Sequence, residues 1–224
     1  MDKQYILLDL DGTLTDPKEG ITKCAQYALA SFGIDEPNLD NLECYIGPPL
    51  DVSFKKFHGL SEEDSWKAVD KYRERFRDKG VFENAVLDGI PQCLETLKAA
   101  GKTLILATCK PQIFMKQIIE HFDLAKYLDF AVGSELDGTR KHKHEVIEEV
   151  FRQLAEKTGK DVVELKADAI MVGDRDQDVN GAHEASVEVV GVRFGYAAPD
   201  ELEDAGADYI VDTVAELTAL LLTE

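Results

Sequence analysis

A short apolar run from Tyr5 to Leu8 ends at two aspartates, Asp9 and Asp11, and this junction constrains the fold most. The run is too short for a helix and rich in β-forming residues, so it predicts a buried strand of a parallel sheet. Open α/β sheets bind ligands at the carboxyl ends of their strands. Asp9 and Asp11 share one side of an extended chain, where two carboxylates require a cation or a shared proton between them.

The rest of the chain alternates between strand and helix patterns from Pro91 onward. Strands are expected at Thr103–Ala107, Phe130–Val132, Ala169–Val172, Val187–Val192 and Tyr209–Val211. Helices are expected at Pro91–Ala100, Ile113–Phe122, His144–Thr158, near Asp178–Ala185, and at the C-terminal end up to Leu222. This alternation predicts an α/β fold with a doubly wound parallel sheet.

A helical segment of about 70 residues interrupts this pattern directly after the first strand. Its first helix carries an apolar stripe formed by Ile21, Cys24, Ala25, Ala28, Leu29 and Phe32. A second helix begins at Ser61, with Asp64 in capping-box position and with Trp66, Val69, Arg73 and Phe76 on one face. We therefore expect a core domain of residues 1–14 and 85–224, and an inserted helical domain of residues 15–84.

The formal net charge of −19 argues against a nucleic-acid polymer as partner, because such a binder needs a basic face. The inserted segment carries 14 acids and 10 Lys/Arg, so most of the negative charge belongs to the expected core. An anionic substrate must then be attracted by a local positive site, because the wider surface repels it.

Membrane and secretory signals are not expected. No apolar stretch approaches the roughly 20 residues that a membrane span needs. The segment Met1–Gln4 enters the first strand directly, without the organisation of a signal peptide. The cysteines Cys24, Cys44, Cys93 and Cys109 form no CxxC pair, which favours reduced thiols and a cytoplasmic protein.

Three further polar clusters stand where the patterns place strand or helix ends. The strand before Thr108 continues as Thr108-Cys109-Lys110-Pro111, and the strand before Gly173 ends in Asp174 to Asp178. The basic run Arg140-Lys141-His142-Lys143 precedes a helix. Each cluster alone is weak evidence for a functional site. Together with Asp9 and Asp11, in this order along the chain, the clusters form a highly specific pattern.

With these motifs the chain resembles the haloacid dehalogenase superfamily, across almost its whole length. The four motifs of that superfamily are DxDGT, a strand-end Thr or Ser, a Lys before a helix, and a strand-end GDxxxD. The resemblance implies a Rossmann-like core, and the helical insert looks like the cap domain of subfamily I. It also implies a Mg²⁺ ion held by Asp9, the backbone carbonyl of Asp11, Asp174 directly, and Asp178 often through water. Such hard oxygen ligands suit Mg²⁺.

The resemblance and the chemistry assign the same roles to the first two aspartates. Asp9 suits a nucleophile that forms an aspartyl-phosphate, and Asp11 suits the general acid and base. Dehalogenase members lack an acid at the second position, so Asp11 favours a phosphatase. Gly12 lets the backbone leave the strand tightly, and Thr108 with the backbone N–H of Cys109 would bind the phosphate.

The catalytic lysine is either Lys141 or Lys143, and the spacing from the Gly-Thr-Arg sequence in similar proteins points to Lys143. Members of the superfamily more often have Asn or Ser at the position of Cys109. Its thiol is expected to be a structural or spectator group, with a reactive thiol as the alternative. His142 and His144 are expected to form a solvated helix start. Arg175 is expected on the surface, with a local carboxylate clamp as the alternative.

The leading functional hypothesis is a Mg²⁺-dependent phosphatase that resembles phosphoglycolate phosphatases and acts on a small phosphorylated metabolite, as a monomer or dimer. The segment Tyr45–Leu50 resembles the specificity loop of those enzymes and of 5′-nucleotidases, so nucleoside 5′-monophosphates are the alternative. Lys55, Lys56 and the run 73–79 are candidate anion contacts, although a solvated helix face is the favoured interpretation for most of them. Tyr45, Phe54 and Phe57 either stack a base or form core.

Three other functions share parts of these motifs. A phosphomutase of the β-phosphoglucomutase kind has all four, and a phosphonate hydrolase needs a cap lysine that nothing here marks. A receiver-like regulatory domain also combines an aspartate cluster with Thr and Lys. It needs neither an insert nor the Asp9/Asp11 pair, so both features argue against it.

Overall fold

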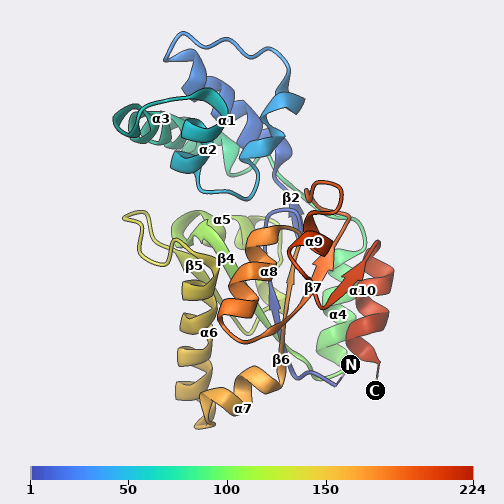
Figure 1. Cartoon of the computed structure of the whole chain (residues 1–224). Coiled ribbons are helices and arrows are strands. Elements are labelled where there is room, and N and C mark those ends of the chain that lie inside the picture. The colour runs from blue at the N-terminus through green and yellow to red at the C-terminus, as the bar shows by residue number, and fades with distance from the viewer. Residues whose placement is uncertain (1, 224) are drawn as a thin grey trace. The chain divides into compact units, whose positions relative to one another are not determined.

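The computed structural model describes residues 2–223, and the chain forms two compact units (Figure 1). The core unit extends up to Thr15 and resumes at Val86, and the helical unit comprises Asp16–Ala85. The two short strands β2 (Thr15–Asp16) and β3 (Ala85–Val86) pair with each other where the chain passes from one unit to the other. The boundaries expected from the sequence lie one residue earlier.

Six parallel strands form the sheet of the core unit, in the order β5-β4-β1-β6-β7-β8. They are β1 (Tyr5–Leu8), β4 (Thr103–Pro111), β5 (Phe130–Ser134), β6 (Ala169–Gly173), β7 (Glu188–Val192) and β8 (Tyr209–Val211). The chain builds outward from β1 on one side and then on the other, so the switch point lies between β1 and β6. This is the strand order of a doubly wound fold, and the predicted fold class is confirmed.

Helices cover both faces of this sheet. They are α4 (Ile90–Ala99), α5 (Gln112–His121), α6 (Lys143–Thr158), α7 (Val162–Ala167), α8 (Asp176–Glu184), α9 (Glu201–Asp204) and α10 (Val214–Leu222), with a short 3₁₀ turn at Ala125–Tyr127. Helix α6 contacts β4 and β5, and α8 contacts β6 and β7, while α4 and α10 pack together elsewhere in the unit. The short helices α7 and α9 were not predicted.

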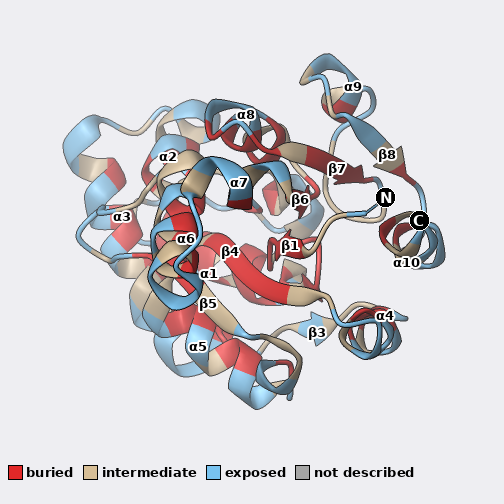
Figure 2. Ribbon diagram, turned by 90° about the horizontal axis from the view of Figure 1, so that it is seen from below, coloured by how far each residue is buried: buried red, intermediate tan, exposed pale blue. Residues whose placement is uncertain are grey.

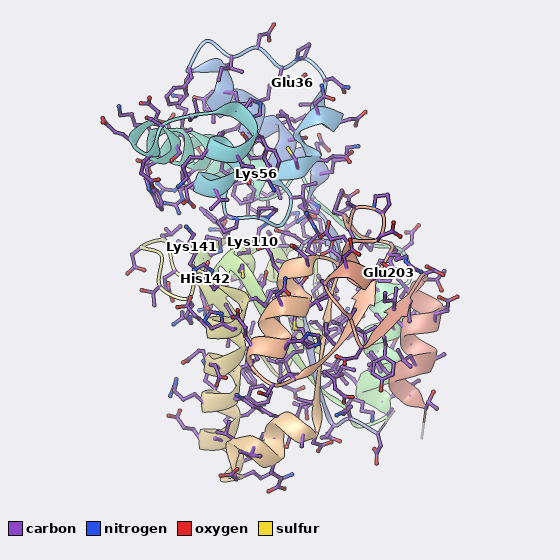
Figure 3. The ribbon with its side chains drawn as sticks, in the orientation of Figure 1. Glu36, Lys56, Lys110, Lys141, His142 and Glu203 are labelled. Carbon is purple, nitrogen blue, oxygen red and sulfur yellow. The ribbon has the colours of Figure 1, made fainter. Side chains whose placement is uncertain are left out.

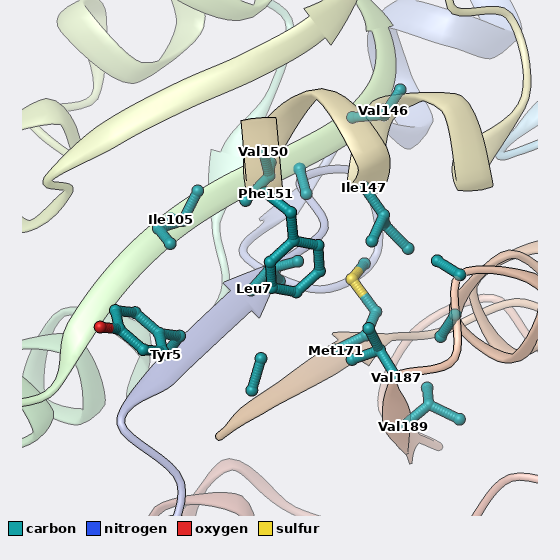
Figure 4. Packing of buried hydrophobic residues seen from close by; sticks show 14 of the residues in the cluster. Tyr5, Leu7, Ile105, Val146, Ile147, Val150, Phe151, Met171, Val187 and Val189 are labelled. Atoms are coloured by element: carbon teal, nitrogen blue, oxygen red, sulfur yellow. The ribbon is translucent and has the colours of Figure 1, made fainter. Parts of the chain in front are cut away.

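Period-two alternation divides the apolar residues of each strand between two cores. Leu7, Ile105 and Met171 point toward α6, where Val150 and Phe151 pack on them (Figure 4). The side chains between them in sequence face the other way, and they too are fully buried. The central strands β1, β4 and β6 therefore lie in the buried centre, whereas the edge strand β8 is only partly buried and the outer faces of the helices are largely exposed (Figure 2).

The helical unit contains three α-helices: α1 (Lys18–Ala30), α2 (Leu50–His58) and α3 (Glu62–Arg75). A 3₁₀ segment spans Leu39–Tyr45, and a π turn spans Phe76–Gly80. The predicted cap of α3 is present, since the Asp64 backbone N–H donates to Ser61 Oγ over 3.1 Å. Helix α2 was not predicted, because its nine residues follow a turn rich in Gly and Pro.

One predicted face in the helical unit is wrong in part: Val69 and Phe76 pack inward as predicted, but Trp66 does not. The stripe on α3 that packs inward is Ser65, Ala68, Val69, Tyr72 and then Phe76. Trp66, which was expected to share that face, is 42% exposed and donates its indole N–H to Glu62. Trp66 follows the buried Ser65 directly in sequence, and one further residue around the helix places it off the buried stripe.

Among residues 2–223, no helix combines the length and the apolar character that crossing a membrane requires.

Candidate active site

Asp9 and Asp11 follow β1 at the switch point of the sheet, where its carboxyl end meets a tight turn. The backbone N–H groups of Thr13, Leu14 and Thr15 all donate to the carbonyl of Leu10, which closes the turn. Gly12 makes this possible with a φ of 83°, a left-handed backbone that a side chain disfavours.

Asp174 and Asp178 lie at the end of the neighbouring strand β6. Asp178 lies in the first turn of α8 and helps to cap it, because its Oδ2 accepts from the backbone N–H of Arg175, the N-cap residue, over 3.1 Å. Gly173 leaves room for it, because a Cβ at position 173 would stand 2.2 Å from the Asp178 carboxyl carbon. One carboxylate oxygen each from Asp9, Asp174 and Asp178 lie within 4.8 Å of one another.

Lys143 is the first residue of α6, and it contacts aspartates from both regions described above. Its Nζ lies 2.5 Å from Asp9 Oδ1 and 2.6 Å from Asp178 Oδ1, and it donates to the Ala107 carbonyl over 2.9 Å. Its side chain is 4% exposed. Burial alone would lower the pKa of this ammonium, but Asp178 and Asp9 raise it overall, so Lys143 is charged at neutral pH.

Two glycines, Gly12 and Gly195, lie directly against Asp174, where neither position has room for a side chain. A Cβ at Gly12 would stand 2.0 Å from Asp174 Oδ2, and one at Gly195 would stand 2.3 Å from the Asp174 Cβ. The Tyr196 backbone N–H donates to Asp174 Oδ2 over 2.7 Å. Sequence reasoning missed Gly195 and Tyr196, which follow β7, because no polar side chain marks them.

Thr108, Cys109 and Lys110 form the end of β4. The Thr108 hydroxyl accepts from the Lys110 backbone N–H, which leaves its own hydrogen available for donation to a phosphate oxygen. Burial raises the pKa of the Cys109 thiol to about 12, so this thiol is protonated at neutral pH. Lys110 was missed: its Nζ lies 2.5 Å from Asp11 Oδ2, and its side chain is 6% exposed.

The signal for Lys110 was present in the sequence. Lys110 stands two residues after Thr108, and residues two apart on a strand share a face. A lysine at the carboxyl end of a strand, on the face of a predicted phosphate ligand, belongs among the candidate site residues.

The carboxylates fit a divalent metal ion. Four carboxylates, of Asp9, Asp11, Asp174 and Asp178, are opposed by the ammonium groups of Lys110 and Lys143, which leaves a formal charge of minus two. Asp174 Oδ1 is buried without a hydrogen-bond partner, as a direct metal ligand would be. Both oxygens of Asp178 have protein partners, which suits contact through water.

Three of these carboxyl groups, those of Asp174, Asp178 and Asp11, have raised pKa values. Burial raises the pKa of Asp174 well above its usual range, and the nearby charges of Asp178 and Asp9 raise it further. Burial also raises the pKa of Asp178 to about 6, against the opposing effect of Lys143. Burial raises the pKa of Asp11 as well, against the opposing effect of Lys110.

Several residues from the sequence analysis lie elsewhere in the core unit. Lys141 is partly exposed on the segment before α6 and His142 is exposed beside it (Figure 3). His144 pairs with Glu184 on α8 over 2.6 Å. Arg175 is not a free surface residue: its Nε donates to Glu201 over 2.7 Å, so the clamp that was kept as the alternative is present.

The residues of the helical unit that were considered as contacts for an anion or a base differ in their burial and in their partners. Tyr45 and Phe54 are 1% and 0% exposed and pack edge to face, so they form core. Phe57 is 39% exposed on α2, with the ammonium of Lys56 over its ring. Lys55 pairs with Glu62, and Arg75 pairs through both terminal nitrogens with Glu83.

Comparison with known proteins points to one family. The sequence profile described as haloacid dehalogenase-like hydrolase matches residues 6–192. A 5′-nucleotidase of Pseudomonas aeruginosa is 49% identical over 198 residues, which cover 88% of this chain and 86% of that protein. A phosphoglycolate phosphatase of Agrobacterium fabrum is 30% identical, over 96% of this chain and 91% of that protein.

A solved structure extends the similarity to the whole fold. The crystal structure of a predicted phosphatase from Clostridium acetobutylicum superimposes with a TM-score of 0.89 at 45% identity, and 98% of each chain is covered. The family profile alone spans more than half of the sequence. This chain belongs to the haloacid dehalogenase-like hydrolase family, and it is an enzyme of the phosphatase type.

Proposed function

We propose that this enzyme hydrolyses small phosphate monoesters with Mg²⁺, in two steps through an aspartyl-phosphate on Asp9. The observation that carries the proposal is the pair Asp9 and Asp11 beside the buried lysine Lys143, whose Nζ lies 2.5 Å from Asp9 Oδ1. Lys143 engages one oxygen of Asp9, and the other oxygen is the proposed nucleophile.

In the first step, Asp9 attacks phosphorus and the ester oxygen leaves with a proton from Asp11. In the second step, Asp11 takes a proton from water, which attacks the phosphorus and releases Asp9. Splitting one difficult displacement into two easier ones is the usual gain of covalent catalysis. Lys143 and the Thr108 hydroxyl neutralise and orient the phosphate oxygens, because phosphoryl transfer depends mainly on position and charge.

The proposed metal ligands are Asp9, the backbone carbonyl of Asp11, Asp174 directly, and Asp178 through water. The unpartnered Asp174 Oδ1 and the surplus negative charge support this set. When bound, Mg²⁺ supplies charge neutralisation at the phosphate, and it retains some water ligands.

Nucleoside 5′-monophosphates and phosphoglycolate are the two proposed substrate classes. The sequence favours phosphoglycolate, but the 49% identity to a 5′-nucleotidase favours the nucleotides over it. We infer that the helical unit acts as the cap that selects the leaving group. Phe57 is its candidate for stacking a base, because Tyr45 and Phe54 are buried.

The test is phosphate release by the purified protein, with p-nitrophenyl phosphate and a panel of small monoesters. We expect turnover with Mg²⁺, loss of turnover with excess EDTA, and recovery when Mg²⁺ is restored. Asp9→Asn should form no phosphoenzyme, whereas Asp204→Asn, a change at an exposed aspartate of α9, should behave as wild type. Full activity in EDTA, or equal phosphorylation of Asp9→Asn, would reject the mechanism.

The substrate panel also separates the remaining alternatives. A phosphomutase would transfer phosphate between sugar positions without releasing it in proportion to substrate. A preference in kcat/KM for 5′-nucleotides that Phe57→Ala removes, with phosphoglycolate turnover unchanged, would support base stacking. Equal effects on both substrates would reject it.

A further inference from the structure

Lys110 is a second buried lysine at the proposed active site, and it contacts a different aspartate from Lys143. Its Nζ lies 2.5 Å from Asp11 Oδ2, and both side chains are largely buried. The other oxygen, Asp11 Oδ1, is buried without a hydrogen-bond partner. The two oxygens of Asp11 are therefore not equivalent: the lysine fixes one, and the other is unengaged.

The end of β4 has an irregular backbone that brings Lys110 to this position. Ala107 pairs with Val132 and Pro111 pairs with Ser134, so three residues of β4 stand opposite the single residue Gly133 of β5. Bulges of this kind change the direction of side chains, and they are frequent beside active sites.

The neighbouring strand holds this irregular segment in place. Ser134 Oγ donates to the Cys109 carbonyl over 2.6 Å. A Cβ at position 133 would stand 2.7 Å from the Lys110 carbonyl oxygen, so the glycine permits the close approach. The Lys110 backbone N–H donates to Thr108 Oγ1, which ties the lysine to the proposed phosphate ligand.

The two lysines therefore contact different members of the Asp9 and Asp11 pair. Lys143, on α6, contacts Asp9 and Asp178. Lys110, on β4, contacts Asp11. A buried ammonium is costly unless it is paired. Apolar side chains of similar size would often stabilise the fold as well as a buried ion pair does, so stability alone does not explain the Lys110–Asp11 pair. Because Lys110 contacts Asp11, the proposed general acid, we consider a role in orienting that carboxyl group.

We infer that Lys110 is a positioning residue, which holds Asp11 Oδ2 so that Oδ1 is presented to the leaving oxygen. This inference rests on the proposed function. In the step concerned, an Asp9 oxygen bonds to phosphorus while the bond from phosphorus to the ester oxygen breaks. The electron pair of that bond stays on the ester oxygen, which takes the proton from Asp11 Oδ1.

The test compares two esters that differ in their need for an acid. The leaving group of p-nitrophenyl phosphate departs readily without protonation, whereas an alkyl alcohol, such as that of glycerol phosphate, requires it. We expect Lys110→Met to lower kcat/KM for the alkyl ester by about 10- to 100-fold more than for the aryl ester, since a misplaced group costs up to about 100-fold. The parameter kcat/KM is used because it excludes the shared dephosphorylation step.

Asp11→Asn should show the same selective loss, and the double variant should lose little more than Asp11→Asn alone, because both changes remove one function. Lys110→Arg should restore part of the alkyl-ester rate. Lys98→Met is the matched control, since Lys98 forms an exposed pair with Asp129 in the same unit, and it should leave both rates unchanged. If Lys110→Met does not fold, as judged by circular dichroism, Lys110→Gln takes its place.

An equal loss on both esters, or additive losses in the double variant, would overturn the inference and leave Lys110 as a structural residue. Failure of the proposed function gives a different result, because the wild-type enzyme would then hydrolyse neither ester.

Discussion

Gly181 on α8 lies directly against the side chain of Lys143 on α6. A Cβ at position 181 would stand 2.5 Å from the Lys143 Cβ and 3.0 Å from the His144 backbone nitrogen. The two helices approach closely only because this position has no side chain, so the distance between α6 and α8 determines where Lys143 enters the site. The same packing brings Lys143 Nζ to 2.6 Å from Asp178, which is on α8 itself.

The first prediction is that Gly181→Ala impairs catalysis while the protein still folds. The added methyl group must push α6 away from α8, which shifts Lys143 relative to Asp9. We expect kcat to fall by roughly 10- to 100-fold, in line with the cost of misplacing a catalytic group. Overpacking should lower the free energy of unfolding by about 1–3 kcal/mol. Kinetics measured well below the melting temperature separate the two effects.

The control for this change is Asn180→Ala at the neighbouring, exposed position of α8. It alters helix propensity without adding bulk near Lys143, so kcat should stay at the wild-type value. A Gly181→Ala enzyme with unchanged kcat would contradict the packing argument.

The second prediction ranks the two lysines before α6. Lys143→Met should lower kcat by about 100- to 1,000-fold, as does the loss of one preorganised donor in other active sites. Lys141→Met should change kcat less than threefold, because Lys141 is partly exposed and lies outside the carboxylate cluster. Steady-state kinetics on p-nitrophenyl phosphate measure both, and the reverse ranking would move the motif to Lys141.

The third prediction concerns metal binding, measured without turnover. Mg²⁺ should raise the melting temperature of the wild-type enzyme, because a ligand at 100 times its Kd stabilises the folded state by about 2.7 kcal/mol. Asp174→Asn should lose this shift, since Asp174 Oδ1 is the buried oxygen without another partner. The exposed change Asp204→Asn should keep it, and an equal shift in all three proteins would argue against the site.

The sequence alone predicted the alternating strands and helices because their apolar residues follow local periods of two and 3.6. Asp9 and Asp11 could be identified because they follow a strand directly. Which lysine reaches them depends on how α6 packs on α8. The distance between these two helices depends on Gly181, which is far from Lys143 in the sequence.

Other parts of the site have no local signal of their own. Gly195 and the backbone N–H of Tyr196 hold Asp174 through contacts across about 20 residues of sequence, and a glycine in a loop does not reveal its neighbour. Lys110 differs, because its spacing from Thr108 was informative. Its contact with Asp11 nevertheless depends on an irregular pairing of β4 with β5 that no sequence period encodes.

The last prediction is that Cys109 reacts slowly with iodoacetamide in the folded enzyme. The thiolate is the reactive form, and burial raises the pKa of Cys109 to about 12, despite the opposing charge of Lys143. At pH 8 the Cys109 thiol is then almost entirely protonated, whereas roughly a quarter of an ordinary cysteine of pKa 8.5 is ionised. The raised pKa means that the fold favours the neutral thiol, so reactivity should increase as pH rises toward 12.

Mass spectrometry of peptides from enzyme treated at pH 8 would compare Cys109 with Cys44, which is also partly exposed. We expect Cys44 to be modified first, and Cys109 to react at the ordinary rate once the protein is unfolded in denaturant. Substitution of Cys109 by serine should also leave kcat near the wild-type value, because a neutral thiol beside Thr108 offers no charge to the phosphate. Rapid labelling of Cys109 in the folded enzyme at pH 8 would instead identify a reactive thiolate at the end of β4.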